Sequence, residues 1–65
     1  MTFGENLRSL RKERNLSIKE LASLSGLSSV QISNYEHDNY APNAITTAKL
    51  VVALKCEYGD LIKKE

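Results

Sequence analysis

Residues 18–36 hold two candidate helices with almost no chain between them. Ser17 opens the first in a Ser-x-x-Glu pattern, which is typical of a capping box at a helix start. Gly26 can adopt the left-handed conformation that ends helices, and only Leu27 separates it from the next cap candidate, Ser28. A connection this short forces the two helices to cross steeply.

The spacing of small and apolar residues meets the steric needs of such a crossing. The contact residue on the first helix must be small, and Ala22 is small. Gly26 opens the turn four residues later, Leu27 fills its underside, and Ile32 is the expected buried anchor of the second helix, with Tyr35 also facing inward. This Ala-x-x-x-Gly-x-x-x-x-x-Ile spacing is what a helix-turn-helix motif requires. The residues that it leaves facing outward are Ser29, Val30, Ser33 and Asn34.

Helical periodicity and turn residues predict three further helices. Phe3, Leu7 and Leu10 repeat at helical spacing, Asn15 ends that helix, and Asn43 caps a later one. The inner stripe of this later helix is expected to be Ala44, Thr47, Ala48, Val51 and Leu54. No segment alternates with a period of two. The sequence therefore predicts an all-α fold of one domain, residues 1–65, with helices at about 3–13, 18–25, 29–36, 44–54 and 58–63.

A chain of 65 residues is near the lower limit for folding without a disulfide or a metal. Its single cysteine, Cys56, excludes an internal disulfide, and no Cys/His cluster suggests a structural metal. We expect Cys56 to be a packed thiol in a reducing cytosol. A redox-sensing role would require exposure and a nearby positive charge, for which Lys55 is the sequence neighbour.

Targeting, membrane and catalytic features are missing from the sequence pattern. Charged residues appear early, at Glu5 and Arg8, with no apolar block after them, unlike in a signal peptide, and apolar runs such as residues 50–54 fall far below the ~20 residues of a membrane span. Acidic residues are scattered, no nucleophile–base pair is visible, and His37 has no neighbouring ligand types. We therefore expect a soluble, cytoplasmic protein without membrane contact, enzymatic activity, cofactor, metal or small-molecule ligand.

The formal net charge is only +1, but the positive charge is unevenly distributed. Residues 1–35 carry five basic and three acidic side chains, and all three arginines, Arg8, Arg11 and Arg14, fall within the first predicted helix or just after it. This arrangement suits a polyanion near one end of the molecule. A solvated basic face is an equally ordinary interpretation.

Nearly the whole chain, residues 3–62, resembles the phage lambda repressor/Cro-like (XRE-type) helix-turn-helix transcriptional regulators. The resemblance lies in Leu-Arg-Ser-Leu-Arg-Lys-Glu-Arg-Asn-Leu-Ser, in Glu-Leu-Ala-Ser-Leu-Ser-Gly-Leu-Ser, in Ile-Ser-Asn-Tyr-Glu and in Pro-Asn. It implies a compact five-helix lambda repressor-like DNA-binding domain. It also implies that the second helix of the motif lies in the major groove of double-stranded DNA and reads base edges there.

On this resemblance, the candidate base contacts are Ser29, Val30, Ser33 and Asn34. Serine hydroxyls can donate or accept hydrogen bonds, and the methyl groups of Val30 could pack on a thymine methyl. Asn34, or Gln31 if it turns outward, could pair bidentately with adenine. The alternative is an ordinary solvated helix surface, which an exposed Val30 makes less favourable.

Phosphate contacts are expected at helix starts and in the loop after the second motif helix. The candidates are Ser17, Lys19, Ser28, Gln31, Asn39 and Tyr40. Two features depart from the family: Ile18 stands where glutamine is frequent, and the loop from His37 lacks the usual basic residues and glycine. Asp38 can adopt the glycine geometry but adds negative charge. Fewer neutralised phosphates predict a shallow salt dependence of DNA binding.

The resemblance implies two further sets of contacts. Arg11 is expected to pair with Glu36, while Arg8, Lys12 and Arg14 could serve either structure or DNA. Family members commonly dimerise near the end of this domain, where apolar residues lie off the predicted core stripes. The candidate dimer residues are Ile45, Val52, Tyr58 and Ile62. A two-fold dimer would present two recognition helices about 34 Å apart to a palindromic operator.

The sequence thus favours a small sequence-specific repressor of phage, mobile-element or restriction-modification-controller type, with DNA and a second copy of the chain as partners. The alternative function is a protein-interaction module on the same fold, such as an antitoxin or an anti-repressor partner. The weakly basic loop and the off-core apolar residues motivate this alternative, which requires a protein partner.

Overall fold

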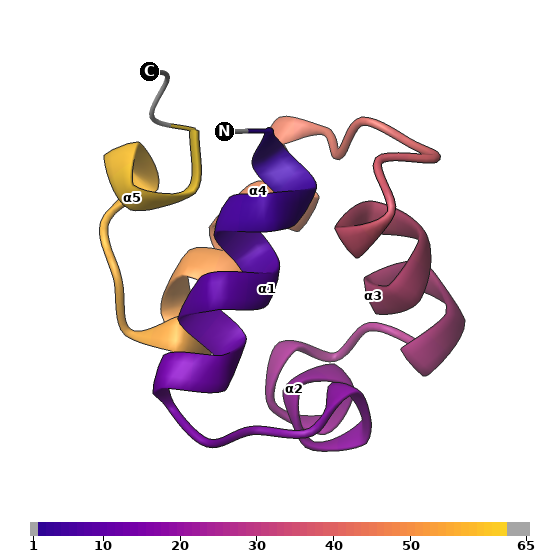
Figure 1. Cartoon of the computed structure of the whole chain (residues 1–65), viewed down its shortest axis with the longest axis vertical. Helices are drawn as coiled ribbons and strands as arrows, with labels where there is room; N and C mark the ends of the chain where they lie inside the picture. The colour runs from indigo at the N-terminus through magenta and orange to yellow at the C-terminus, as the bar shows by residue number, and fades with distance from the viewer. Residues whose placement is uncertain (1, 63–65) are drawn as a thin grey trace.

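The structure, a computed structural model, describes residues 2–62 and contains five α-helices and no strand within them. The helices are α1 (Phe3–Glu13), α2 (Ile18–Ser25), α3 (Ser29–Glu36), α4 (Ala44–Leu54) and α5 (Tyr58–Ile62). Figure 1 shows α1 crossing in front of α4, with α2 and α3 on one side and α5 on the other. The predicted all-α, five-helix fold is confirmed. The predicted end of the last helix, residue 63, lies outside the described residues.

Each of the first four helices begins at a side chain that accepts a hydrogen bond from the first turn. These caps are Thr2, Ser17, Ser28 and Asn43. Three of them are reciprocal capping boxes, closed by the side chains of Glu5, Glu20 and Gln31. The predicted caps at the starts of α2, α3 and α4 are present. The box of α1 extends the same pattern to a helix start whose cap the sequence analysis does not predict.

Four helices end by reversing the chain through a residue of positive φ. These residues are Asn15, Gly26, Asp38 and Lys55. Glycine adopts this left-handed region freely, and Asn and Asp do so with a small penalty. Lysine has no such tolerance, so Lys55 at φ 53° is the strained member of the set.

The core is one cluster to which every helix contributes. Its buried apolar residues are Leu7, Leu21, Ala22, Ile32, Tyr35, Leu50, Leu54 and Leu61. One prediction for α4 is wrong in detail, because Ala44 and Ala48 are exposed whereas Leu50 is fully buried beside Thr47. Burying a leucine removes much more apolar surface from water than burying an alanine, so α4 turns its Leu50 side inward.

Polar side chains of α1 and of its C-cap residue hold α5 and the end of α4 in place. The Asn6 side-chain nitrogen donates to the Leu61 carbonyl at 2.8 Å, which holds α5 against α1. The Arg14 Nε donates to the Leu54 carbonyl at 2.6 Å and so satisfies a free acceptor at the end of α4. Within residues 2–62, every helix is too short or too polar to cross a bilayer.

Candidate nucleic-acid interface

The turn between α2 and α3 has the geometry that the sequence predicts. Gly26 adopts φ 75°, and its N–H and that of Leu27 both donate to the Ala22 carbonyl, at 2.9 and 3.1 Å. Ala22 is buried where the helices pack, Ile32 is fully buried, and Leu27 packs partly buried against the core. Together these residues fix how α3 is presented at the surface.

The outer face of α3 carries the four predicted base contacts. Val30, Ser33 and Asn34 follow the i, i+3, i+4 spacing that places side chains on one helix face, and Ser29 lies one turn from Ser33. Ser29 is exposed, Ser33 and Asn34 are half-buried, and Val30 is 70% exposed. A valine this exposed contributes little to the fold, which favours a role for it in contact with another molecule.

Gln31 is occupied at the start of α3. Its side-chain oxygen accepts from the Ser28 N–H at 2.9 Å, and the Ser28 hydroxyl oxygen accepts from the Gln31 N–H at 3.1 Å. The Ser-x-x-Gln spacing is the sequence signal that could have predicted this capping box. Gln31 therefore turns its carboxamide oxygen to the helix end, and the geometry favours this structural use over adenine recognition.

The candidate phosphate contacts flank α3 on two sides. Ser17 and Lys19 are exposed at the start of α2, and Ser28 is exposed at the start of α3, where free backbone N–H groups favour anions. Asn39 and Tyr40 are exposed in the loop that follows α3. Figure 1 shows this loop and α2 at opposite ends of α3. Such an arrangement suits a helix that enters a groove between two sugar-phosphate backbones.

The loop after α3 begins with a hydrogen-bonded reversal at Asp38. Asp38 has φ 59°, as the sequence anticipates for a residue in the glycine position. Its carboxylate accepts from the Gly4 N–H at 2.9 Å and from the Thr2 hydroxyl at 2.7 Å. The negative charge thus lies at the start of α1, where the helix dipole stabilises it. The negative charge that the sequence places in this loop is therefore hydrogen-bonded within the protein.

The predicted pair of Arg11 and Glu36 is present and largely buried. Its Nε–Oε2 distance is 2.6 Å and its Nη2–Oε1 distance is 3.1 Å, while Nη1 donates to the Leu16 carbonyl at 2.8 Å. The two side chains are 11% and 5% exposed. Arg11 therefore connects α1 to the end of α3, and three of its N–H groups donate within the protein.

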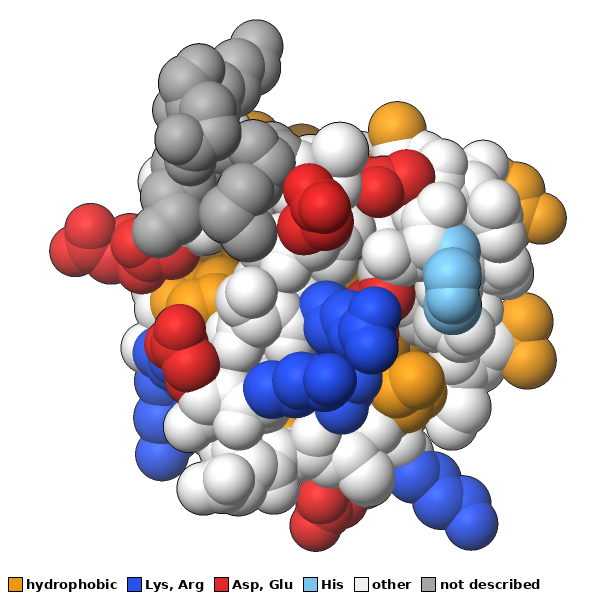
Figure 2. Space-filling model, viewed as in Figure 1, with side chains coloured by type: hydrophobic (Ala, Val, Ile, Leu, Met, Phe, Trp, Pro, Cys, Tyr) orange, Lys and Arg blue, Asp and Glu red, His pale blue; other side chains and the backbone are white. Residues whose placement is uncertain are grey.

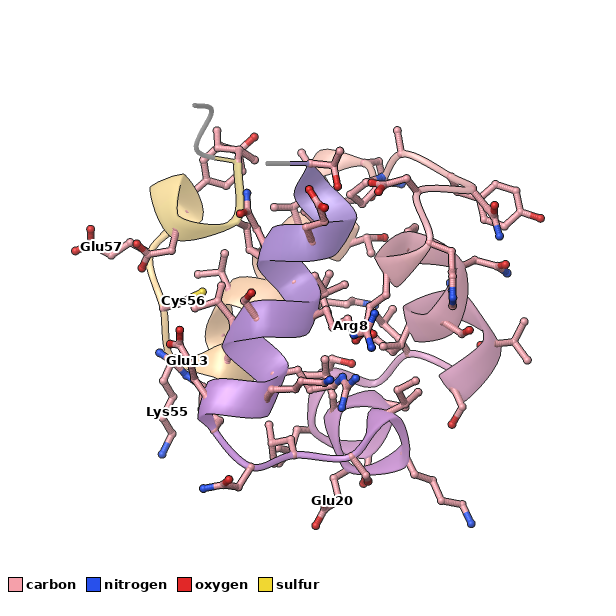
Figure 3. All side chains as sticks on the ribbon, viewed as in Figure 1. Arg8, Glu13, Glu20, Lys55, Cys56 and Glu57 are labelled. Atoms are coloured by element: carbon pink, nitrogen blue, oxygen red, sulfur yellow. The ribbon has the colours of Figure 1, made fainter. Side chains whose placement is uncertain are left out.

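The remaining cations of α1 divide into two groups. Arg14 binds the carbonyl groups at the end of α4, which assigns it to the fold. Arg8 and Lys12 are exposed, and Figure 2 shows Lys and Arg side chains gathered near the middle of the face that α1 presents. Arg8 lies on α1 toward α3 in Figure 3 and borders a small hollow with Ile18 and His37. These two cations remain candidates for contact with a polyanion.

The four candidate dimer residues are all exposed, and three of them border two different hollows. Val52 borders one hollow with Leu24 and Ala48, and Ile45 lies about two helical turns before Val52 on α4. Tyr58 and Ile62 border the other. Its further aromatic members are Phe3 and Tyr40. The described part of the chain thus offers two apolar surfaces rather than a single patch.

Outside this interface, few side chains of residues 2–62 could bind a metal or undergo redox chemistry. Residues 2–62 contain no group of three or more His, Cys, Asp or Glu side chains placed to bind a metal ion. Cys56 is half-buried, and burial raises the pKa of its thiol, as does the nearby Asp60, while Arg14 lowers it. A thiol held in its protonated form is a poor redox sensor.

A steep α2–α3 crossing, a tight glycine turn and an exposed α3 define a helix-turn-helix domain. Residues 4–65 match the family described as the helix-turn-helix domain. The chain therefore belongs to this family, and it is of the phage lambda repressor/Cro-like (XRE) type that its sequence resembles.

Two curated relatives cover nearly all of this chain. It is 44% identical over 64 residues to the HTH-type transcriptional repressor RghR of Bacillus subtilis, which covers 97% of this chain and 47% of the relative. It is 31% identical over 65 residues to the immunity repressor protein of Bacillus phage phi105, covering 100% of this chain and 45% of the relative. The chain thus spans about half the length of the curated relatives it matches.

Two solved structures match over their full fold. The restriction-modification controller protein C.AhdI from Aeromonas hydrophila superposes with a TM-score of 0.89 at 35% identity, covering 92% of this chain and 91% of that protein. The P22 c2 repressor in complex with a synthetic operator superposes with a TM-score of 0.91 at 31% identity, covering 100% and 98%. Both therefore share the fold described here.

Proposed function

We propose that this chain is the sequence-specific DNA-binding domain of a small transcriptional repressor, with α3 in the major groove. The observation that carries the proposal is the outer face of α3, exposed between the start of α2 and the loop after α3. The relatives named as repressors, and the similarity to a repressor solved on a synthetic operator, support it. We infer that the chain has no enzymatic role and that it acts in the cytoplasm.

Recognition would combine hydrogen bonds and apolar contact at base edges. The hydroxyls of Ser29 and Ser33 donate or accept, Val30 packs its methyl groups on a thymine methyl, and Asn34 hydrogen-bonds a base. Contacts to phosphate would fix the register of α3 without specifying sequence. The groups for these contacts are Ser17, Lys19, Ser28 and Tyr40, with the free N–H groups of two helix starts.

We further propose that the protein binds as a homodimer on a palindromic operator. Two-fold symmetry would place two copies of α3 about 34 Å apart, on successive turns of one DNA face. The exposed apolar residues on α4 and α5 supply surface for this contact: Ile45, Val52, Tyr58 and Ile62. Sedimentation at tens of micromolar, with and without operator DNA, tests it, and a monomeric mass in both samples would contradict it.

The test of the main proposal is competition binding on genomic fragments at moderate salt. We expect one or a few fragments to bind far better than random DNA, and Ser33→Ala to reduce that preference. Ser23→Ala is the matched control, because Ser23 is an exposed serine on α2 outside the proposed contacts. If no fragment binds better than random DNA, specific repression is wrong.

A second function is favoured by the apolar hollow that Leu24, Ala48 and Val52 border. The domain would then act as a protein-interaction module, such as an antitoxin or an anti-repressor partner. A stoichiometric partner that co-purifies with the protein supports this function if activity also survives in the Ser33→Ala/Asn34→Ala variant. Loss of activity in that variant favours DNA recognition instead.

A further inference from the structure

Asn39, in the loop after α3, is bonded to Asn34 on the helix at two points. Its backbone N–H donates to the Asn34 carbonyl at 2.9 Å. Its side-chain nitrogen Nδ2 donates to the side-chain oxygen Oδ1 of Asn34 at 3.1 Å. Asn34 is half-buried on the outer face of α3, and Asn39 is exposed. A loop residue thus contacts the side chain that is proposed to read a base.

The backbone part of this contact does not depend on the Asn39 side chain. The N–H of Asp38 donates to the Tyr35 carbonyl at 3.1 Å, and together with the Asn39–Asn34 bond this forms the Schellman motif that ends α3. The Asp38 carboxylate also fixes the reversal to the Gly4 N–H. Residue 39 is therefore held beside Asn34 by the backbone, and only the bond between the two carboxamides depends on its side chain.

That bond determines which end of the Asn34 carboxamide is left for DNA. A carboxamide has one oxygen, which accepts up to two hydrogen bonds, and one nitrogen, which donates two. In the structure Asn39 holds the oxygen of Asn34 toward the loop, so the nitrogen, on the other arm of the carboxamide, is the end directed to a base edge. Adenine recognition needs both ends of the group, whereas guanine N7 and O6 and thymine O4 are acceptors that need donors alone.

We propose that Asn39 is a positioning residue that orients the Asn34 carboxamide, so that Asn34 donates to an acceptor-bearing base, guanine or thymine. The inference rests on the proposed function, because it assumes that Asn34 faces the major groove. It replaces the sequence-based interpretations that Asn34 pairs bidentately with adenine and that Asn39 contacts phosphate. The two bonded asparagines would act as one unit of base selection.

The test is selection of binding sites from a randomised operator library by the wild type, Asn34→Ala, Asn39→Ala and Asn39→Asp. Asn39→Ala keeps the backbone bond and removes the side-chain bond. We expect Asn39→Ala to weaken the base preference at the same base pair as Asn34→Ala does, by at least about threefold. The upper limit is the loss of a whole bidentate base contact, roughly 5- to 150-fold. Preferences at the other positions should stay unchanged.

Asn39→Asp gives the sharper result because a carboxylate only accepts hydrogen bonds. Asn34 would then turn its nitrogen toward residue 39 and its oxygen toward DNA. We expect the preference at that base pair to move to a base with a donor, cytosine N4 or adenine N6. Ala41→Asp is the matched control, since it adds the same charge to the same exposed loop and should weaken binding to all sequences without changing the preference.

Three outcomes of this selection would contradict the proposals in different ways. If the wild type enriches no sequence, the proposed function fails and this inference fails with it. If the wild type enriches a site but Asn39→Ala only weakens all sequences equally, Asn39 is a phosphate contact and the positioning role is wrong. If Asn39→Asp keeps the wild-type base, the Asn34 nitrogen already faced the loop, and the proposed orientation is overturned. Urea unfolding of each variant confirms that all of them fold.

Discussion

The carboxylate of Asp38 accepts a hydrogen bond from the backbone N–H of Gly4 at 2.9 Å, which joins the loop after α3 to the start of α1. The same junction brings the backbone of α1 against the last carbonyls of α3. A side chain at position 4 would place its Cβ 2.5 Å from the Glu36 oxygen and 2.6 Å from the Tyr35 oxygen. Gly4 is thus the residue that lets the recognition helix dock on α1.

We therefore expect Gly4→Ala to destabilise the fold. Alanine normally favours a helix over glycine by about 1 kcal/mol, but two backbone oxygens block its methyl group here and cannot move independently of α3. The expected loss is about 1–3 kcal/mol in the free energy of unfolding, measured with urea. Gly59→Ala is the matched control, because a methyl group added there would have no atom within 4 Å, and it should be neutral or slightly stabilising.

The pair of Arg11 and Glu36 should contribute strongly to stability. Removing one partner of a largely buried pair leaves the other charge without compensation, so Arg11→Met alone and Glu36→Met alone are each expected to lower the free energy of unfolding by about 3 kcal/mol or more. The double variant Arg11→Met/Glu36→Met should be more stable than either single variant, since it leaves no unpaired charge. Thermal unfolding of the four proteins tests this, and additive losses would contradict it.

A contact could be predicted from the sequence when its two residues lie close together along the chain. The cap of α2 at Ser17, its box with Glu20 and the turn at Gly26 lie within a few residues, so a local pattern encodes them. The bonds from Gly4 to Asp38 and from Arg14 to Leu54 join residues far apart in the chain, and no local pattern signals them.

The candidate interface divides in the same way. The outward face of α3 follows from helical spacing around Ile32, so the sequence could predict it. The bond between Asn34 and Asn39 depends on the reversal at Asp38, which brings residue 39 back beside the helix. Whether a polar side chain faces DNA or a neighbouring residue is decided by the folded geometry.

The sparse positive charge near α3 predicts a shallow salt dependence of DNA binding. Each neutralised phosphate adds about 0.9 to the slope of log K against log salt concentration. Lys19 is the one cation among the residues proposed to contact phosphate, and Arg8 and Lys12 are the exposed cations of α1.

We expect the slope of log K against log salt concentration to be below about 3 in magnitude per subunit. Lys19→Ala should reduce it by about 1, and Lys19→Arg should leave it unchanged. A slope typical of strongly basic binders would show that other cations contact DNA.

The left-handed residues predict two substitutions of opposite sign. Lys55 has φ 53°, so Lys55→Gly should relieve backbone strain and stabilise the protein by up to about 1 kcal/mol. Gly26→Ala should destabilise by about 1 kcal/mol or more for conformational reasons alone, since no atom lies within 4 Å of its added Cβ. Each kcal/mol corresponds to about 4–8 °C in Tm for a domain of this size. Equal signs for the two changes would contradict this account.

The environment of Cys56 predicts slow thiol chemistry and a loss of stability at alkaline pH. Burial raises the pKa of this thiol, Asp60 raises it further, and Arg14 opposes them in part. A thiol whose pKa is higher in the folded than in the unfolded protein stabilises the fold fully below the unfolded pKa, about 8.5, and this stabilisation is lost as pH rises through the folded pKa.

Alkylation of Cys56 by iodoacetamide should therefore be slower in the native than in the urea-unfolded protein, with a higher midpoint in its pH–rate profile. Asp60→Asn removes the charge that raises the pKa of Cys56 but keeps an oxygen that can accept from the Glu57 N–H, so it should move the midpoint down without unfolding α5. A native midpoint below that of the unfolded chain would mean that a positive charge dominates at Cys56 and would restore the redox-sensing interpretation.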